Sequence, residues 1–295
     1  MNIKASEKVS ILIVTHNSYP DIRTTIDSIV ENISNIDYEI IVVDNNSSET
    51  NILDYLKTQS ENGNIQFIPL KANLGFGRAN NIAFSLASFE NILILNPDIT
   101  FDANSEINVI RLINFVENKK SIGAVSPALI KPDGLLDYNY RLNIKPIRLI
   151  LNRFKKIYYN VNVNVEKKVQ NSELNVSTLA GAFIIIKSRN YKLINGFDER
   201  YFMYSEDLDF SCKLKAYGLD LFVLTDLFFK HNVGSSSRKN PYRMIYHMYK
   251  SIVQFYFKWS FSIFIRDVLL FIIVSPFVFI EILIRSIKNN KNVSD

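Results

Sequence analysis

The sequence is nearly free of cysteine: one residue, Cys212, occurs among 295. A single thiol excludes an intramolecular disulfide framework and a cysteine-based zinc site. Cys212 lies at helical core spacing with Leu208, so we expect a buried thiol rather than a nucleophile.

The sequence also lacks a recognisable secretory signal. Residues 1–8 are short and polar, and the apolar run at residues 9–14 is too short for an h-region. The sequence therefore predicts that the main part of the chain stays in the cytoplasm.

The positive charge is unevenly distributed. The formal net charge is +5, but residues 227–295 hold ten Lys and Arg against three Asp and Glu, whereas residues 1–226 hold 24 against 26. The basic excess thus coincides with strongly hydrophobic sequence. This pattern favours an anionic membrane surface and argues against a nucleic-acid partner.

The first 95 residues alternate between short apolar runs and helical patterns. Strands are predicted at residues 9–14, 38–43, 65–69 and 91–95. Helices are predicted at about 20–32, after residue 48 to about 59, and from the 73–81 stretch to about 88. This alternation is typical of βαβ units on a parallel sheet, in which ligands bind at the carboxyl ends of the strands. His16, Asn17 and Asp44 follow such ends.

A glycine-containing loop, Asn73 to Asn81, opens one of these helices. Gly75 and Gly77 permit close approach of the backbone, and a helix N-terminus favours an anion such as phosphate. A dinucleotide fingerprint would follow the first strand and end in a third glycine, where this loop has Asn80. The pattern therefore argues against a dehydrogenase.

Two polar positions at strand ends are candidates for metal binding. Asn96-Pro97-Asp98 follows the strand at 91–95, and an acid there is suited to a divalent cation bridging phosphates, or else it caps a turn. His231 ends a short strand before a Gly/Ser loop and is either a metal ligand or a structural histidine.

The stretch at residues 196–218 gathers aromatic and acidic side chains. Glu206, Asp207 and Asp209 follow an aromatic block and open a predicted helix that ends at Gly218. Carboxylates at a helix start suit the helix dipole, and a partly desolvated one is a candidate general base. A solvated acidic turn is the alternative.

The remaining sequence predicts a helix at 103–117, a strand at 123–127 and a turn at 131–134. A core strand is expected at 176–187, a helix at 189–195, and short strands at 221–224 and 227–230. Residues 141–168 carry eight basic residues against one acid. We interpret them either as an insertion near the mouth of the site or as a solvated loop.

In this order the motifs resemble the inverting family 2 glycosyltransferases, especially their rhamnosyltransferase-like branch. The matching blocks span about residues 9–237: VSILIVTHN (9–17), IIVVDNNSS (40–48), NLGFGRANN (73–81), LILNPD (93–98), GAVSPAL (123–129), GAFIII (181–186), GFDERYFMYSEDLDF (196–210) and HNVGSS (231–236). The resemblance implies an α/β GT-A fold, the Rossmann-like fold of nucleotide-diphospho-sugar transferases, with a mostly parallel central sheet flanked by helices. A hydrophobic helical appendage follows, so we predict a catalytic domain at 1–237 and a tail at 238–295.

The resemblance also implies a role for each matching residue. Asp207, of the Glu206-Asp207 pair, would be the general base, and Asp98 with His231 would hold Mg²⁺ or Mn²⁺. The donor, a dTDP- or UDP-sugar, would lie along a further set of residues: Thr15, Asn17, Asp44, Asn73, Gly75, Arg78 and Asn96. One base and one cation match the needs of an inverting transfer.

Three positions depart from the family's pattern. His16 stands where tyrosine is usual, and Lys213 and Lys215 stand where arginines are common. None of these changes removes a metal ligand or the base. We therefore expect an active enzyme, and any effect of these changes to fall on donor choice.

The tail combines aromatic and basic residues. Residues 241–259 are rich in aromatics, and residues 268–280 form an almost unbroken apolar run. A full membrane span needs about 20 apolar residues, and stretching the run to 261–284 includes three charges. We expect attachment to the cytoplasmic face of a bacterial cell membrane through residues 241–285; a single span, or a helical hairpin that packs on the core or forms a homodimer, is the alternative.

Two functions from different classes fit these observations. The first is transfer of a sugar, rhamnose being one candidate, to a glycan or lipid-linked acceptor in cell-surface polysaccharide synthesis. The second is a non-catalytic module of the same fold that binds a nucleotide sugar or a glycan. Intact Asp98, Asp207 and His231 favour the enzyme.

Overall fold

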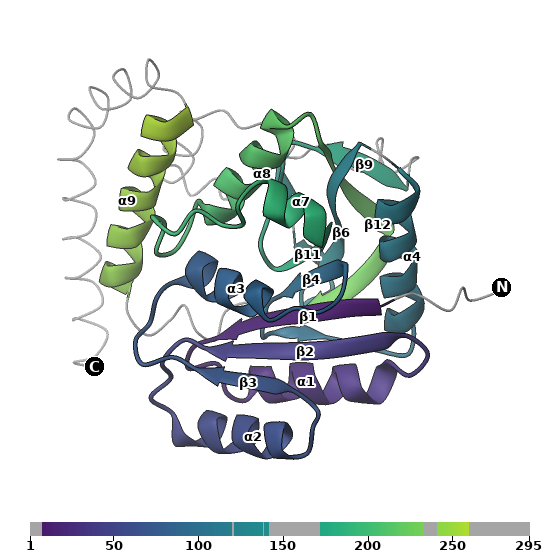
Figure 1. Ribbon diagram of the computed structural model, residues 1–295, viewed down its shortest axis with the longest axis vertical. Helices are drawn as coiled ribbons and strands as arrows, with labels where there is room; N and C mark the ends of the chain where they lie inside the picture. Colours follow the sequence, from purple (N-terminus) through teal and green to yellow (C-terminus); the bar gives the residue numbers. More distant parts are fainter. Residues whose placement is uncertain (1–7, 120, 138, 142–171, 233–240, 260–295) are drawn as a thin grey trace. The chain divides into compact units, whose positions relative to one another are not determined.

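The computed structural model (Figure 1) describes residues 8–119, 121–137, 139–141, 172–232 and 241–259. The chain divides into two compact units. The first comprises Met1–Ile144 and Lys167–Ser251, and the second Lys145–Glu166 and Ile252–Asp295. The central sheet and the candidate site lie in the first unit.

Four parallel strands form the N-terminal half of the sheet, in the order β3-β2-β1-β4. Their bounds are β1 (Lys8–Thr15), β2 (Asp37–Asp44), β3 (Gln66–Pro69) and β4 (Asn91–Leu95). Seven consecutive residues of β1 and all five of β4 are buried. This continuous burial explains why these strands appear in the sequence as unbroken apolar runs rather than alternating patterns.

The other half of the sheet mixes strand directions and continues the order as β11-β6-β12-β5. Strand β11 (Phe183–Lys187) runs antiparallel to β4 and to β6 (Ile122–Ile130), and β6 runs parallel to β12 (Asp220–His231). Short strands complete the edges: β5 (Ile99–Thr100) and β9 (Glu173–Val176) pair with β12, and β7 (Leu136–Asp137) pairs with β6. A separate pair joins β8 (Tyr140–Arg141) to β10 (Thr178–Leu179).

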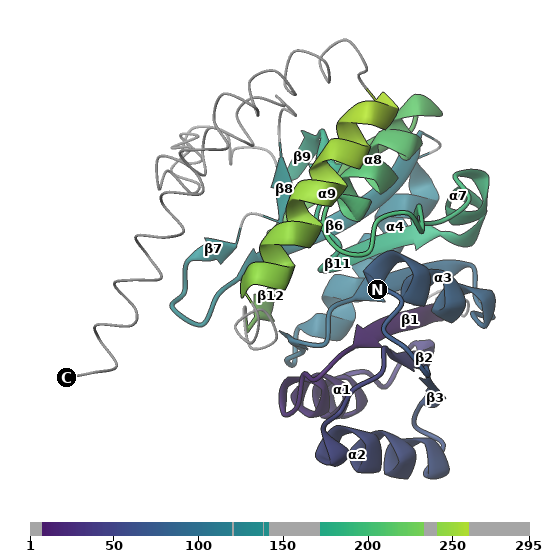
Figure 2. The same cartoon turned by 90° about the vertical axis from the view of Figure 1, so that its left-hand side faces the viewer.

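Helices cover both faces of the sheet, as Figures 1 and 2 show from two directions. One apolar cluster packs α1 (Asp21–Asn32), α2 (Thr50–Glu61) and α4 (Ser105–Asn118) against one face. The second cluster packs α3 (Phe76–Ser85), α7 (Ser188–Leu193) and α8 (Glu206–Ala216) against the other. Alternate side chains of β1 divide between the clusters, as Ile11 and Leu12 do, so the three-layer arrangement follows from the strand period of two.

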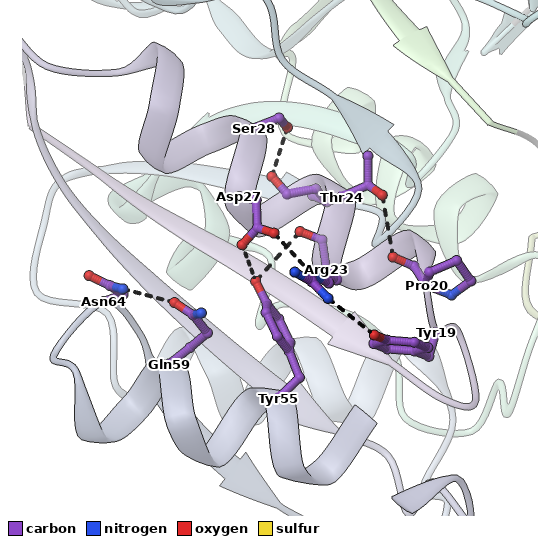
Figure 3. A network of polar contacts seen from close by, with 10 residues as sticks. Tyr19, Pro20, Arg23, Thr24, Asp27, Ser28, Tyr55, Gln59 and Asn64 are labelled. Atoms are coloured by element: carbon purple, nitrogen blue, oxygen red, sulfur yellow. Dashed lines mark hydrogen bonds and ion pairs between the residues drawn. The ribbon is translucent and has the colours of Figure 1, made fainter. Parts of the chain in front are cut away.

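A polar network ties α1 to α2 (Figure 3). The Tyr55 hydroxyl donates to Asp27 Oδ1 at 2.7 Å, and Arg23 Nε donates to Asp27 Oδ2 at 3.3 Å. Burial, followed by the hydrogen bond to Asp27, raises the pKa of Tyr55 above its ordinary value. The neutral phenol is therefore the form that bridges the two helices.

The fold class expected from the sequence is confirmed: the protein has an α/β fold with a large, mostly parallel sheet. Strand β4 has the predicted bounds, and the turn at residues 131–134 joins β6 to β7, with Gly134 N donating to Lys131 O at 2.9 Å. The predicted single strand at 176–187 is wrong, because β9, β10 and β11 share that region and Ala180, Gly181 and Ala182 lie outside strands. The two predicted strands at 221–224 and 227–230 are one, β12, with a register shift between Leu224 and Phe228.

The helical pattern of the sequence puts Leu208, Cys212, Leu214 and Tyr217 roughly on one face of α8, and this expectation needs correction. Phe210 and Leu214 are buried, but Cys212 is only half-buried and Tyr217 is 55% exposed. The helix begins with buried polar residues, so its inner face is set by Glu206 and Asp209 as well as by apolar positions. The thiol is therefore less enclosed than the sequence suggested.

Helix α9 (Pro241–Trp259) follows the sheet, and it belongs to the first unit as far as Ser251. Among the residues that the structure describes, no helix is long and apolar enough to cross a membrane. The basic insertion beyond Arg141 and the apolar run at 268–280 lie outside the described residues. The boundary at 237/238 stays a prediction.

Candidate active site

Three segments leave the sheet at the same edge. Thr15 pairs with Asp44 at the ends of the parallel strands β1 and β2. Leu95, which ends β4, pairs with Ile13, so Asn96 follows at the level of the last residues of β1. The register thus brings the predicted donor residues from three strands to the carboxyl end of the sheet, as the βαβ pattern indicated.

The first group of polar side chains is closely connected. The Asp44 carboxylate accepts hydrogen bonds from the backbone nitrogen of Ser47, at 2.9 Å, and from the Ser47 hydroxyl. Asn17 N donates to Ser47 Oγ at 2.8 Å, and Asn17 Oδ1 accepts from Ser48 N at 2.8 Å. Asp44 is only 1% exposed, so its orientation is fixed before any ligand arrives.

Turn geometry supports this group. Asn17 has φ +51° and Asn46 has φ +64°, values that asparagine tolerates better than most residues. The hydroxyls of Thr15 and Ser18 share a hydrogen bond, so the Thr15 side chain is tied to the loop that follows β1. Local turn chemistry and the hydrogen bonds between Asn17 and residues 47 and 48 therefore shape this end of β1 and β2 together.

The glycine-containing loop is linked to the same edge. Leu74 N donates to Asn45 Oδ1 at 2.7 Å, next to Asp44, and Gly75 N donates to Asn73 Oδ1 at 3.0 Å. Gly75 has φ +87°, and a Cβ there would lie 2.1 Å from the carbonyl oxygen of Phe202. Only glycine allows the loop to meet the aromatic block at this distance.

Arg78 and Asn96, two predicted donor residues, make other contacts in the structure. Arg78 Nε lies 3.3 Å from Glu199 Oε2, and both side chains are about half exposed. Asn96 N donates to Ala182 O at 2.9 Å. Arg78 therefore helps to join α3 to the segment before α8, where Asn81 makes further bonds to Phe197 N and O at 2.9 Å each.

The acidic start of α8 is preceded by an unusual backbone. Tyr204 and Ser205 both have positive φ, +67° and +65°, although neither is glycine. Glu206 and Asp207 follow in the first turn, and Leu208 N donates to Asp207 Oδ1 at 2.8 Å. A carboxylate at this position is stabilised by the N-terminal end of the helix dipole.

The acids of this turn lie in different environments. Glu206 is buried, its Oε2 accepts no hydrogen bond from the described residues, and burial followed by the charge of Asp207 raises its pKa to about 8. Asp207 is half-buried. Asp209 is fully buried. The pKa of Tyr201 is raised by the burial of its ring and, to a smaller extent, by the charge of Asp209. Desolvation thus falls more heavily on Glu206 than on the half-buried Asp207.

Asp98 and His231 lie next to each other. His231 Nε2 lies 3.2 Å from Asp98 Oδ1, and Asn232 N donates to Asp98 O at 2.9 Å. On its other side, His231 Nδ1 bonds Asp137 Oδ2 at 2.7 Å. Burial disfavours the charged imidazole, but the two carboxylates outweigh it and raise the pKa of His231 to about 9.

A cation would be held here through Asp98 and His231 once it replaced the imidazole proton that the two carboxylates favour. Asp98 Oδ1 is buried and faces His231 Nε2 at 3.2 Å, and Asp137 orients the imidazole in the way that outer carboxylates orient metal-binding histidines. Among the described residues, no group of three or more His, Cys, Asp or Glu is placed to hold a metal. Mg²⁺ in particular is commonly bound by one or two carboxylates together with substrate phosphates.

Sequence reasoning missed three features of the site. Asn45 links β2 to the glycine-containing loop, Asp137 reaches His231 from the hairpin strand β7, and the paired positive φ values precede the acids. Asn45 stood inside the DNNSS block and was a detectable candidate. Asp137 had no sequence signal beyond the preceding turn.

Comparison of the sequence with known families identifies the family of this chain. The sequence model of the family described as glycosyl transferase family 2 matches residues 10–185, which is more than half of the chain. The protein therefore belongs to glycosyl transferase family 2.

Its relatives include two bacterial rhamnosyltransferases. The N-acetylglucosaminyl-diphospho-decaprenol L-rhamnosyltransferase of Mycobacterium tuberculosis is 27% identical over 191 residues, 59% of this chain and 61% of the relative. Rhamnosyltransferase WbbL of Escherichia coli is 27% identical over 223 residues, 72% of this chain and 79% of the relative. The match to the mycobacterial enzyme thus spans less than two thirds of that enzyme's length.

A solved structure supports the fold. GalNAc-T7, crystallised with UDP, GalNAc and Mn²⁺, matches with a TM-score of 0.61 at 14% identity, covering 84% of this chain and 47% of that protein. At this identity the likeness concerns the fold alone, and it agrees with the GT-A arrangement expected from the sequence.

Proposed function

We propose that the protein transfers a sugar, rhamnose in the leading case, from a nucleoside-diphosphate donor to a hydroxyl of a glycan or lipid-linked acceptor, with inversion. The main support for this proposal is that three strand ends meet at one edge of the sheet and bring together Thr15, Asp44 and Asn96. The names of the two rhamnosyltransferase relatives support the choice of sugar. The reaction would serve cell-surface polysaccharide synthesis in a bacterium.

The donor would lie along the connected polar group. Asp44, fixed by Ser47, would accept from the imide of a pyrimidine base, while Thr15 and Asn17 would line the ribose. Asn73 and Gly75 would continue toward the diphosphate, near the start of α3. Arg78 would join them if its ion pair with Glu199 opened.

Asp207 would act as the general base. The acceptor oxygen would attack the anomeric carbon and Asp207 would take its proton. The bond between that carbon and the diphosphate oxygen would break, and the nucleoside diphosphate would leave with the electron pair. Glu206, whose pKa is raised to about 8, would stay protonated near neutral pH and leave the negative charge to Asp207.

Asp98 and His231 would hold Mg²⁺ or Mn²⁺, with Asp137 keeping the imidazole oriented. A cation there would supply positive charge to the departing diphosphate. The protein's own contribution would be to hold two ligands at fixed positions and leave the remaining coordination to phosphate and water.

The tail would bring the enzyme to its acceptor. We propose that residues 241–285 attach to the cytoplasmic face of the cell membrane, since they combine basic and aromatic residues with an apolar run. A lipid-linked acceptor would then be concentrated at the same surface.

Thermal shift and donor hydrolysis with a panel of nucleotide sugars, with and without Mg²⁺ or Mn²⁺, test the proposal. We expect one donor to stabilise the protein only with metal, and Asp98→Ala to abolish that response. Asp54→Ala, an exposed acid on α2, is the matched control and should respond like the unchanged protein. A response to donor without any turnover, unchanged in Asp207→Asn, would instead support a non-catalytic binding module.

A further inference from the structure

Helix α9 contacts the segment that leads into the acidic pair. The Ser251 hydroxyl donates to Met203 O at 2.8 Å, and Ser251 is 2% exposed. One turn earlier on the same helix, the His247 ring stacks on Phe202, with ring centroids 4.4 Å apart and planes 30° apart. Both contacts lie within the first unit, which includes α9 as far as Ser251.

The same segment is held on another side by the glycine-containing loop. Phe76 N donates to Phe202 O at 3.2 Å, at the point where Gly75 has no room for a Cβ. The carbonyl oxygens of two successive residues, Phe202 and Met203, are therefore bonded by two different elements. Neither element is adjacent to the segment in sequence.

These two hydrogen bonds account for the unusual backbone of the next two residues. Tyr204 and Ser205 both lie in the left-handed region, which two successive non-glycine residues rarely occupy without outside support. Ser205 O then accepts from Asp209 N at 2.9 Å and starts α8. The direction in which α8 leaves this turn sets where the carboxylate of Asp207 lies.

We propose that the first turns of α9 are part of the catalytic unit, and that His247 and Ser251 are positioning residues that hold the turn at Phe202–Ser205 and thereby place Asp207. The inference rests on the proposed role of Asp207 as the base. A helix that the sequence assigns to the tail thus shapes the active site. Loss of either contact releases the turn from one side while leaving the donor residues on β1, β2 and β4 in place.

Hydrogen–deuterium exchange tests the contact independently of any activity. We expect Ser251→Ala in the full chain to speed amide exchange in peptides covering 202–209 at least tenfold, with exchange in β1 and β4 unchanged. Ser28→Ala is the matched control, because Ser28 is also a buried helical serine whose hydroxyl donates to a backbone carbonyl, Thr25 O, at 2.9 Å. Unchanged exchange at 202–209, or the same acceleration in Ser28→Ala, overturns the proposal.

Kinetics with the donor found by the panel then test positioning. Ser251→Ala and His247→Ala should lower kcat about tenfold, which corresponds to about 1.4 kcal/mol, and leave the dissociation constant of the nucleoside diphosphate within about twofold. His247→Phe keeps an aromatic ring against Phe202 and should retain most of kcat. An equal loss in His247→Phe, or a change confined to donor binding, contradicts a positioning role.

The two tests separate the possible failures. Faster exchange in a protein that transfers no sugar from any donor would uphold the contact and remove the proposed function. Normal exchange in an active enzyme would remove the inference alone. A Ser251→Ala protein without a cooperative melting transition would show that α9 is needed for folding, which contradicts a local positioning role.

Discussion

At the scale of single residues, the adjacent acids Glu206 and Asp207 differ in burial and in hydrogen bonding. Glu206 is buried, and its Oε2 accepts no hydrogen bond within the part of the chain that the structure describes. Asp207 is half-buried, and its Oδ1 accepts a hydrogen bond from Leu208 N in the first turn of α8. Asp207→Asn should therefore reduce kcat by about 10²- to 10⁴-fold, the usual contribution of a positioned base. Donor affinity by calorimetry should stay within about twofold, and Asp207→Asn with normal turnover would remove this residue as the base.

The buried carboxyl group of Glu206 also predicts a pH dependence of stability. Its pKa is raised from 4.5 to about 8 by burial and then by Asp207, so the folded state holds this proton more tightly than the unfolded chain. Its contribution to stability is thus greatest below about pH 4.5 and falls as pH rises toward 8, by at most about 1.4 kcal/mol per pH unit.

Glu206→Gln removes this titration. Urea unfolding at pH 5, 6, 7 and 8 should show the variant gaining stability relative to the unchanged protein as pH rises. Glu61→Gln, at the exposed end of α2, provides the control and should show no such trend. A constant difference between Glu206→Gln and the unchanged protein across this range would contradict the burial of a protonated carboxyl.

Asp137 gives a prediction on metal affinity. Its carboxylate holds His231 Nδ1 at 2.7 Å, which leaves Nε2 directed at Asp98. Because outer carboxylates of this kind affect metal affinity by about 10- to 100-fold, Asp137→Asn should weaken Mn²⁺ binding by at least about tenfold. Electron paramagnetic resonance of free Mn²⁺ measures this directly. Asp133→Asn, in the exposed turn before the same strand, should bind as before.

These residues show what the sequence could and could not indicate about the site. Thr15, Asn17 and Asp44 were predicted together and lie together, since parallel register fixes which strand ends are neighbours. Asp137 could not be predicted, because its role depends on a hairpin that brings β7 to the end of β12. The roles of the predicted donor residues, the base and the metal ligands stay predictions.

At the scale of elements, one glycine determines how two loops meet. Gly75 and Gly63 both have positive φ, +87° and +76°, but a Cβ at Gly63 would meet nothing within 4 Å. Gly63→Ala should therefore cost only the backbone strain, about 1 kcal/mol. Gly75→Ala must in addition move the Phe202 carbonyl, so its loss of unfolding free energy should exceed that of Gly63→Ala by ~1–3 kcal/mol. Equal losses in chemical denaturation would show that the loops can separate freely.

Prediction of elements succeeded where the pattern was local. The strands of the parallel half appear as continuous apolar runs and were located to within one or two residues. The errors fall where tertiary pairing decides. The predicted strand at 176–187 is divided because β9 pairs with β12, β10 with β8 and β11 with β4. Strand β12 continues through a register shift that a single sequence does not reveal. The face of α8 was misassigned because buried acids replaced apolar side chains at its start.

At the scale of the whole molecule, α9 connects the catalytic unit to sequence with a different character. The helix belongs to the first unit as far as Ser251, and the positive charge and the apolar run lie at and beyond it. If the tail serves only for attachment, removing all of it should leave catalysis intact. If α9 positions the turn before Asp207, the point of truncation matters.

Two truncated chains separate these possibilities. A chain ending at Trp259 keeps His247 and Ser251 and should hydrolyse donor at a rate close to that of the full chain, while losing sedimentation with anionic vesicles. A chain ending at Arg238 should lose both properties, with kcat reduced about tenfold or more because the contacts to Phe202 and Met203 are gone. Neutral vesicles serve as the control for charge. Full activity in the shorter chain would remove α9 from the catalytic unit, and unchanged sedimentation of the longer one would place the attachment before residue 260.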